Sequence, residues 1–187
     1  YGNRAWLWSA RGEIDRTADD LRHASQLARE SGQALVERSV VHNLSEQMLW
    51  EGKLDESLQL ARRSLSLQSR AAEGGTAMDR LLLARVLAAR GELTELREVL
   101  ASFSGEVVGE HDLQSAKTLE VLHALATNGS ADVWEKALDG TEPVFVQLRL
   151  ELWMLAARHG RLSDTRTVIA RDLAAADPLW RRRIHEL

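Results

Sequence analysis

Apolar residues recur along this chain at the three- and four-residue spacing of an amphipathic helix. One such run ends at Gly52 and another follows it, and the same arrangement surrounds Gly91 and Gly160. No segment alternates apolar and polar residues with the period of two that a half-buried strand shows. The pattern therefore predicts an all-α protein built from pairs of antiparallel helices.

A short motif recurs five times at the turn inside each predicted pair: glycine, any residue, an apolar residue, then Asp, Ser or Thr. Glycine ends a helix because it adopts the left-handed backbone conformation readily. The residue that closes the motif is expected to cap the next helix by accepting a hydrogen bond from its exposed amides. The five motifs occupy residues 12–15, 52–55, 91–94, 129–132 and 160–163, with their glycines 40, 39, 38 and 31 residues apart.

Breaks in the helical periodicity predict where each repeat of two helices ends. Residues 178–187 look like the first helix of a sixth repeat, without its partner. Because the chain also starts at Tyr1 rather than Met, we expect it to be a fragment of a longer protein. The repeats of this single predicted domain are 1–32, 33–73, 74–105, 110–140 and 141–177, with a partial sixth at 178–187.

The repeats resemble tetratricopeptide (TPR) repeats, and the resemblance covers essentially the whole chain. It implies an α-solenoid, a right-handed superhelix of stacked helix pairs. The second repeat carries the motif most clearly, and the first and third follow it. The matching residues are Leu44, Ser45, Gly52, Leu54, Ser57, Ala61 and Ser64 in the second, Ala5, Trp8, Gly12, Thr17, Leu21 and Ala24 in the first, and Leu83, Ala84, Leu87, Gly91 and Phe103 in the third.

The repeat length departs from the usual TPR, which has about 34 residues. Intervals near 40 are similar to the extended repeats of bacterial signalling proteins, such as STAND-type ATPases and maltose-regulator-like transcription factors. HEAT and armadillo repeats share the longer period and are the structural alternative. The glycine-containing corner favours the TPR-like interpretation.

In TPR proteins the first helix of each pair lines the concave surface and carries ligand recognition. The resemblance therefore implies a protein- or peptide-binding module of a larger bacterial regulatory or signalling protein. Sensing of a small-molecule effector and self-association through the terminal repeats remain alternative functions. The residues expected on the concave face are Trp6, His42, Glu46, Trp50, Arg85, His123 and Met154.

Some of these side chains have a simpler interpretation as packing residues. Trp50 lies close to its corner, where it would wedge neighbouring repeats together. Histidines such as His42 and His123 are more often solvated or core-edge residues than ligands. The tryptophans Trp6, Trp8, Trp134, Trp153 and Trp180 are more typical of packing in the core or between repeats than of a ligand cage.

Composition and motifs argue against several other functions. The 187 residues include no cysteine and six histidines without the spacing of a helical zinc site, and no phosphate-binding loop or nucleophile elbow is present. We therefore expect no enzyme, no metal and no cofactor. The net charge of −4 suggests no nucleic-acid partner, and no apolar run approaches the roughly 20 residues of a membrane helix. Together with the lack of cysteine, this indicates a cytoplasmic protein.

Overall fold

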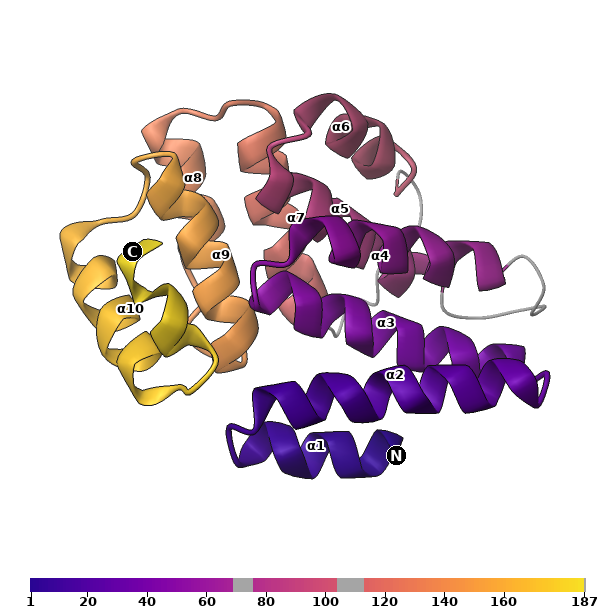
Figure 1. Ribbon diagram of the computed structural model, residues 1–187. Helices are drawn as coiled ribbons and strands as arrows, with labels where there is room; N and C mark the ends of the chain where they lie inside the picture. Colours follow the sequence, from indigo (N-terminus) through magenta and orange to yellow (C-terminus); the bar gives the residue numbers. More distant parts are fainter. Residues whose placement is uncertain (69–75, 104–112, 187) are drawn as a thin grey trace. The chain divides into compact units, whose positions relative to one another are not determined.

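The computed structural model describes residues 1–68, 76–103 and 113–186, and every regular element in these ranges is a helix. The all-α prediction is therefore confirmed for the described part of the chain, which contains ten α-helices and one 3-10 helix (Figure 1). The predicted repeat boundaries near residues 73–75 and 105–110 fall outside the described residues. The helices are α1 (Gly2–Ala10), α2 (Ile14–Glu30), α3 (Ala34–Trp50), α4 (Leu54–Gln68), α5 (Thr76–Arg90), α6 (Leu93–Ala101), α7 (Leu113–Ala126), α8 (Ala131–Leu138), α9 (Val146–Arg158), α10 (Asp164–Ala176) and η1 (Trp180–Glu186).

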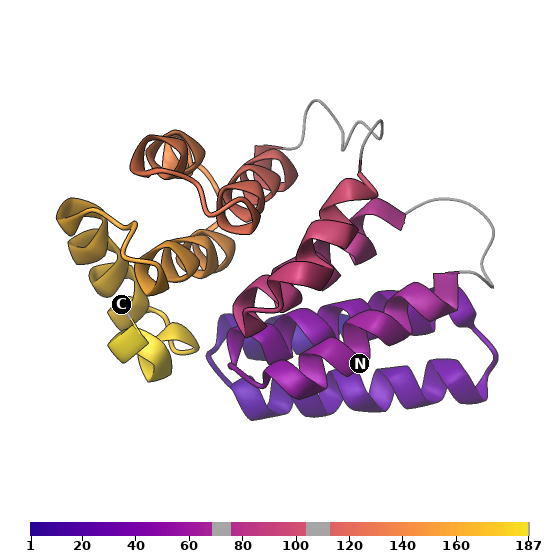
Figure 2. The same ribbon diagram turned by 90° about the horizontal axis from the view of Figure 1, so that it is seen from above.

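The chain divides into two compact units, and the first spans Tyr1–Val86. In this unit each helix packs against the next, α1 on α2, α2 on α3 and α3 on α4 (Figure 2). Small residues allow the paired helices to approach closely. The buried core cluster joins α1, α2 and α3 through Ala5, Ala18, Leu21, Val40, Leu44 and Met48.

Hydroxyl groups fasten the paired helices of the first unit at equivalent positions. Ser45 and Ser57 each donate from Oγ to the other's backbone carbonyl, at 2.8 Å in both directions. The Thr17 hydroxyl lies 3.5 Å from the Ala5 carbonyl. In both pairs the carbonyl lies seven residues before the corner glycine and the hydroxyl five residues after it. Two successive helix pairs therefore repeat the same contact as well as the same motif.

The second compact unit spans Leu87–Leu187. Here α7 packs against α6, α8 and α9, while η1 packs against both α9 and α10. The tryptophans of this unit fill its core, since Trp134, Trp153 and Trp180 are all no more than 2% exposed. The expectation that these three serve packing is confirmed.

The predicted corners form with one recurring hydrogen-bond pattern. At Gly52 the glycine amide donates to Leu49 at 3.0 Å, and the next amide, of Lys53, donates to Met48 at 2.9 Å. This pair of bonds is the Schellman motif, which requires a left-handed residue, and Gly52 has φ of 77°. The same pair of bonds closes the corners at Gly12, Gly32, Gly91 and Gly160.

The fourth corner corrects the sequence-based prediction by one residue. Asn128, not Gly129, is the left-handed residue, with φ of 51°. Gly129 follows it and donates to the Ala124 carbonyl at 2.8 Å. A Cβ on Gly129 would lie 2.8 Å from Cγ1 of Val133. Glycine is therefore present here because of limited space, while asparagine tolerates the left-handed turn.

The predicted helix caps are wrong at four of the five corners. Helices α2, α4, α6 and α8 begin two residues earlier than expected, so Asp15, Asp55, Thr94 and Asp132 are their second residues. The three carboxylates among them act on the positive end of the helix dipole instead of capping an amide. Only at the last corner does the predicted residue cap as expected, since Ser163 accepts a bond from the Arg166 amide at 3.4 Å.

Candidate partner-binding surface

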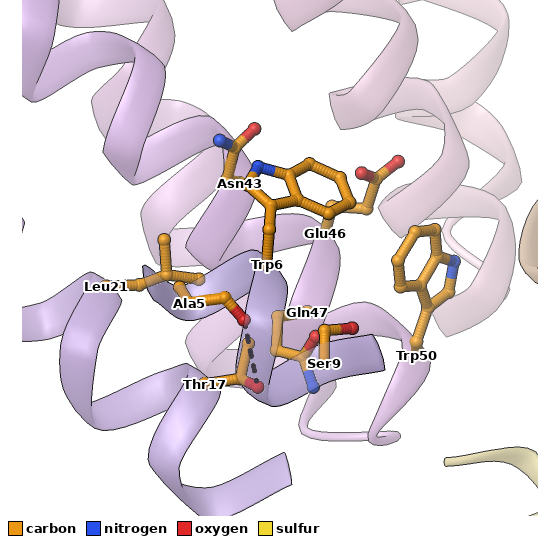
Figure 3. Close-up of a pocket in the computed structure, with 9 residues that line it drawn as sticks. All are labelled: Ala5, Trp6, Ser9, Thr17, Leu21, Asn43, Glu46, Gln47 and Trp50. Atoms are coloured by element: carbon orange, nitrogen blue, oxygen red, sulfur yellow. Dashed lines mark hydrogen bonds between the residues drawn. The ribbon is translucent and has the colours of Figure 1, made fainter. Parts of the chain in front are cut away.

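A small pocket lies between α1 and α3, and residues of α2 also line it (Figure 3). Three of the residues predicted for the concave face line this pocket: Trp6, Glu46 and Trp50. Sequence reasoning missed the polar residues around them, although Asn43 and Gln47 are one helical turn apart on the face of α3 that carries Glu46. The pocket is lined by Ala5, Trp6, Ser9, Thr17, Leu21, Asn43, Glu46, Gln47 and Trp50.

The two indoles of the pocket differ in exposure. Trp6 is 64% exposed, whereas its neighbour Ala5 is buried against α2 and holds α1 in place. Trp6 is therefore not a core residue, and it lies beside α3 of the next predicted repeat. Trp50 is 8% exposed and mainly forms a buried wall of the pocket. An exposed tryptophan beside a pocket is a frequent anchor of binding energy in protein interfaces.

Glu46 connects the pocket to the next first helix. Its Oε1 accepts a bond from Nη1 of Arg85 at 2.6 Å, and the Arg85 side chain is only 7% exposed. Trp6, Glu46 and Arg85 each lie six residues before a corner glycine. Equivalent positions of α1, α3 and α5 are thus neighbours in space, through a shared pocket in one case and an ion pair in the other.

His42 belongs to a separate polar cluster around the buried carboxylate of Asp79, which is 2% exposed. His42 Nδ1 lies 2.8 Å from Oδ1, Ser64 Oγ donates to Oδ1 at 2.7 Å, and Arg38 Nε donates to Oδ2 at 2.7 Å. Burial raises the pKa of Asp79, but the hydrogen bonds from His42, Ser64 and Arg38 outweigh it and hold the pKa below its usual value.

The cluster combines Ser, His and Asp but is not connected as a nucleophilic triad. A serine nucleophile needs histidine as its hydrogen-bonded base, with the carboxylate behind the histidine. Here the carboxylate of Asp79 separates Ser64 from His42, and Ser64 is fully buried. The arrangement fastens α3, α4 and α5 together. Asp79 was missed because 37 residues separate it from His42 and no local pattern marks it.

The two remaining candidates lie in the second compact unit. His123 is exposed and borders a shallow, mostly apolar pocket between α7 and α8. Met154 is 3% exposed and packs into the core. Of the seven predicted residues, the structure therefore brings Trp6, Glu46 and Trp50 together in one pocket, with Arg85 bonded to its rim.

The described residues contain no group of three or more His, Asp or Glu side chains that could hold a metal ion. None of their helices is both long enough and apolar enough to cross a membrane.

No protein-family model, curated protein or solved structure matches the chain. The resemblance to TPR repeats therefore stays a prediction from the sequence.

Proposed function

We propose that the chain is a TPR-like stack of helix pairs that binds a segment of another protein on the surface formed by its first helices. In this proposal the helix pairs continue as a right-handed solenoid, and the chain is part of a larger cytoplasmic regulatory protein of a bacterium.

The observation that carries the proposal is the contact between equivalent residues of successive first helices. Trp6 and Glu46 line one pocket, and Glu46 pairs with Arg85 at 2.6 Å. In a solenoid each repeat contacts its neighbours with the same faces, so equivalent positions meet. Such contacts support a stack whose first helices share one surface.

The binding role follows from the side chains on that surface. Trp6 exposes most of an indole beside a pocket that the partly exposed amide of Asn43 also lines. Burying an aromatic side chain supplies much of the energy of a protein interface, and a neighbouring amide can satisfy a polar group of a bound segment. We therefore infer that Trp6 is the principal anchor for the partner.

Selection of peptides from a displayed random library against the full chain tests this proposal. The selected peptides are then measured by calorimetry against three proteins: wild type, Trp6→Ala and Leu7→Ala. Leu7 is the matched control, because it is 62% exposed on the same helix and does not line the pocket. We expect Trp6→Ala to weaken binding at least about 30-fold, the loss of a hot spot of roughly 2 kcal/mol, and Leu7→Ala to leave it unchanged.

Two outcomes of this experiment would contradict the proposal. Selected peptides that bind Trp6→Ala as tightly as wild type would place the binding surface elsewhere. A library that yields no binding peptide would count against the binding module itself.

A further inference from the structure

The pocket at Trp6 contains a chemical combination that suits a positive charge. We propose that it binds a cationic side chain, lysine or a methylated lysine, of the partner segment, with the cation held between the indoles of Trp6 and Trp50 and facing Glu46. This inference rests on the proposed function and specifies the ligand of the same site.

The charge of the pocket is the first argument. Among the nine residues that line it, Glu46 is the only one with an ionisable side chain, and it is a carboxylate. The others are apolar, aromatic or neutral polar residues, so no lining residue repels a cation. In Figure 3 the carboxylate of Glu46 projects toward the space between the two indoles.

The position of Arg85 is the second argument. Its side chain is 7% exposed and donates to Oε1 of Glu46, so it orients the carboxylate without lining the pocket. A carboxylate offers about four acceptor positions on two oxygens. The bond to Arg85 therefore leaves acceptor capacity on the carboxylate for a ligand ammonium.

The indoles are the third argument. Tryptophan attracts cations more strongly than other aromatic side chains do, and cages of aromatic residues recognise methylated ammonium groups. Trp6 presents a largely exposed ring, while Trp50 forms a buried wall. The neutral amide of Asn43, which also lines the pocket and is partly exposed, suits the backbone of the segment that carries the cation.

Three capped pentapeptides test the inference, each with four glycines and a central lysine, trimethyl-lysine or norleucine. Norleucine is the neutral control of nearly the same shape. Binding to the full chain is followed by NMR through the indole N–H signals of Trp6 and Trp50, assigned by single substitution. We expect both cationic peptides to bind at least about fivefold more tightly than norleucine, as a cation–π contact of roughly 1 kcal/mol implies.

Substitutions separate a cation site from an apolar one. Trp6→Leu keeps an apolar side chain but removes the aromatic face, so it should weaken the cationic peptides about fivefold and leave norleucine unchanged. Glu46→Gln should weaken the lysine peptide more than the norleucine peptide. Because this substitution also leaves the buried Arg85 charge unbalanced, its melting temperature should fall, and binding is compared at a temperature at which the variant is folded. Leu7→Ala should change nothing.

Several results would overturn the inference. Norleucine binding as tightly as lysine, or Trp6→Leu weakening all three peptides equally, would show an apolar anchor pocket. Absence of binding by every pentapeptide would also reject it. The peptide library separates this inference from the proposed function. Library peptides that depend on Trp6 but lack lysine and arginine would reject the cation site and leave the proposed function intact. A library without any Trp6-dependent peptide would reject the proposed function itself.

Discussion

At the scale of single residues, the first compact unit is held together by buried charges that are fully paired. Asp79 accepts bonds from side chains of α3 and α4, and Asp20 binds Arg4 and Trp8 of α1 at 2.5–2.9 Å. A buried carboxylate without such partners would cost several kcal/mol, so each of these groups depends on its neighbours. Residues far apart in the sequence are thereby fixed in register.

Asp79→Asn tests this dependence. The amide cannot balance the charge of Arg38, so we expect the free energy of unfolding at pH 7 to fall by about 3 kcal/mol. Urea denaturation followed by circular dichroism measures the change. Asp19→Asn is the control, because this carboxylate is 76% exposed and its pair with Arg22 is solvated. It should shift stability by less than about 0.5 kcal/mol.

The difference in stability between wild type and Asp79→Asn should depend on pH in one direction. The pKa of Asp79 is lower in the folded protein than its usual value, because hydrogen bonds to the charged carboxylate outweigh burial. A lowered pKa gives stability that is complete above the unfolded value of about 4 and is lost as the pH falls through the folded value. The gap between wild type and Asp79→Asn should therefore narrow below about pH 4. A gap that stays constant down to pH 2 would contradict this role.

At the scale of elements, the corners decide where helices stop, and each uses one left-handed residue. Gly91 has φ of 76° and open space around its Cβ position. Gly91→Ala therefore adds backbone strain without a clash, and we expect a loss of about 1 kcal/mol. Asn128→Gly places glycine at the left-handed residue of the fourth corner, so stability should rise or remain within about 0.5 kcal/mol. Equal losses in the two variants, measured by thermal unfolding, would argue against these corner geometries.

Helix capping gives a second pair of matched variants. Ser163 accepts a hydrogen bond from the first turn of α10, whereas Ser130 occupies the same position before α8 without a side-chain bond. Ser163→Ala should therefore reduce the free energy of unfolding by about 1 kcal/mol, and Ser130→Ala by distinctly less. The same urea denaturation measures both. A larger effect at Ser130 would show that its hydroxyl has the capping role.

The sequence allowed the corners and the helix pairs to be predicted because both depend on local features. A glycine and a run of apolar residues at helical spacing are readable in one segment, as around Gly52. The shift from Gly129 to Asn128 was not predictable from the motif, since Asn tolerates the same conformation. Four of the five caps were misplaced by two residues, because a carboxylate such as Asp55 is favourable both at the cap and in the first turn.

The candidate site was predictable only in part, for a physical reason. Trp6 and Glu46 were identified because the resemblance to TPR repeats implies that such positions of the first helices face the concave surface. Asn43 and Asp79 were missed because their partners are supplied by packing between helices, which no local pattern records. The polar cluster that holds His42 could therefore be found only from the three-dimensional arrangement.

At the scale of the whole molecule, we propose that all helix pairs continue as one stack. Its second helices would then carry equivalent exposed residues at increasing distance along the solenoid. Asp19, Gln59, Glu98 and Lys136 each lie seven residues after a corner glycine and are exposed. Since the chain has no cysteine, introduced cysteines at pairs of these positions accept spin labels without competing sites.

Pulsed electron–electron double resonance measures the distance between two spin labels. Applied to such pairs, with residue 19 as the common reference, it tests the proposed stack most directly. Neighbouring helices pack about 10 Å apart, so each further repeat should lengthen the distance by roughly that amount. We predict that the distance from residue 19 increases in the order 59, 98, 136. A distance to residue 136 shorter than that to residue 98 would show that the helix pairs do not follow one another in a single solenoid.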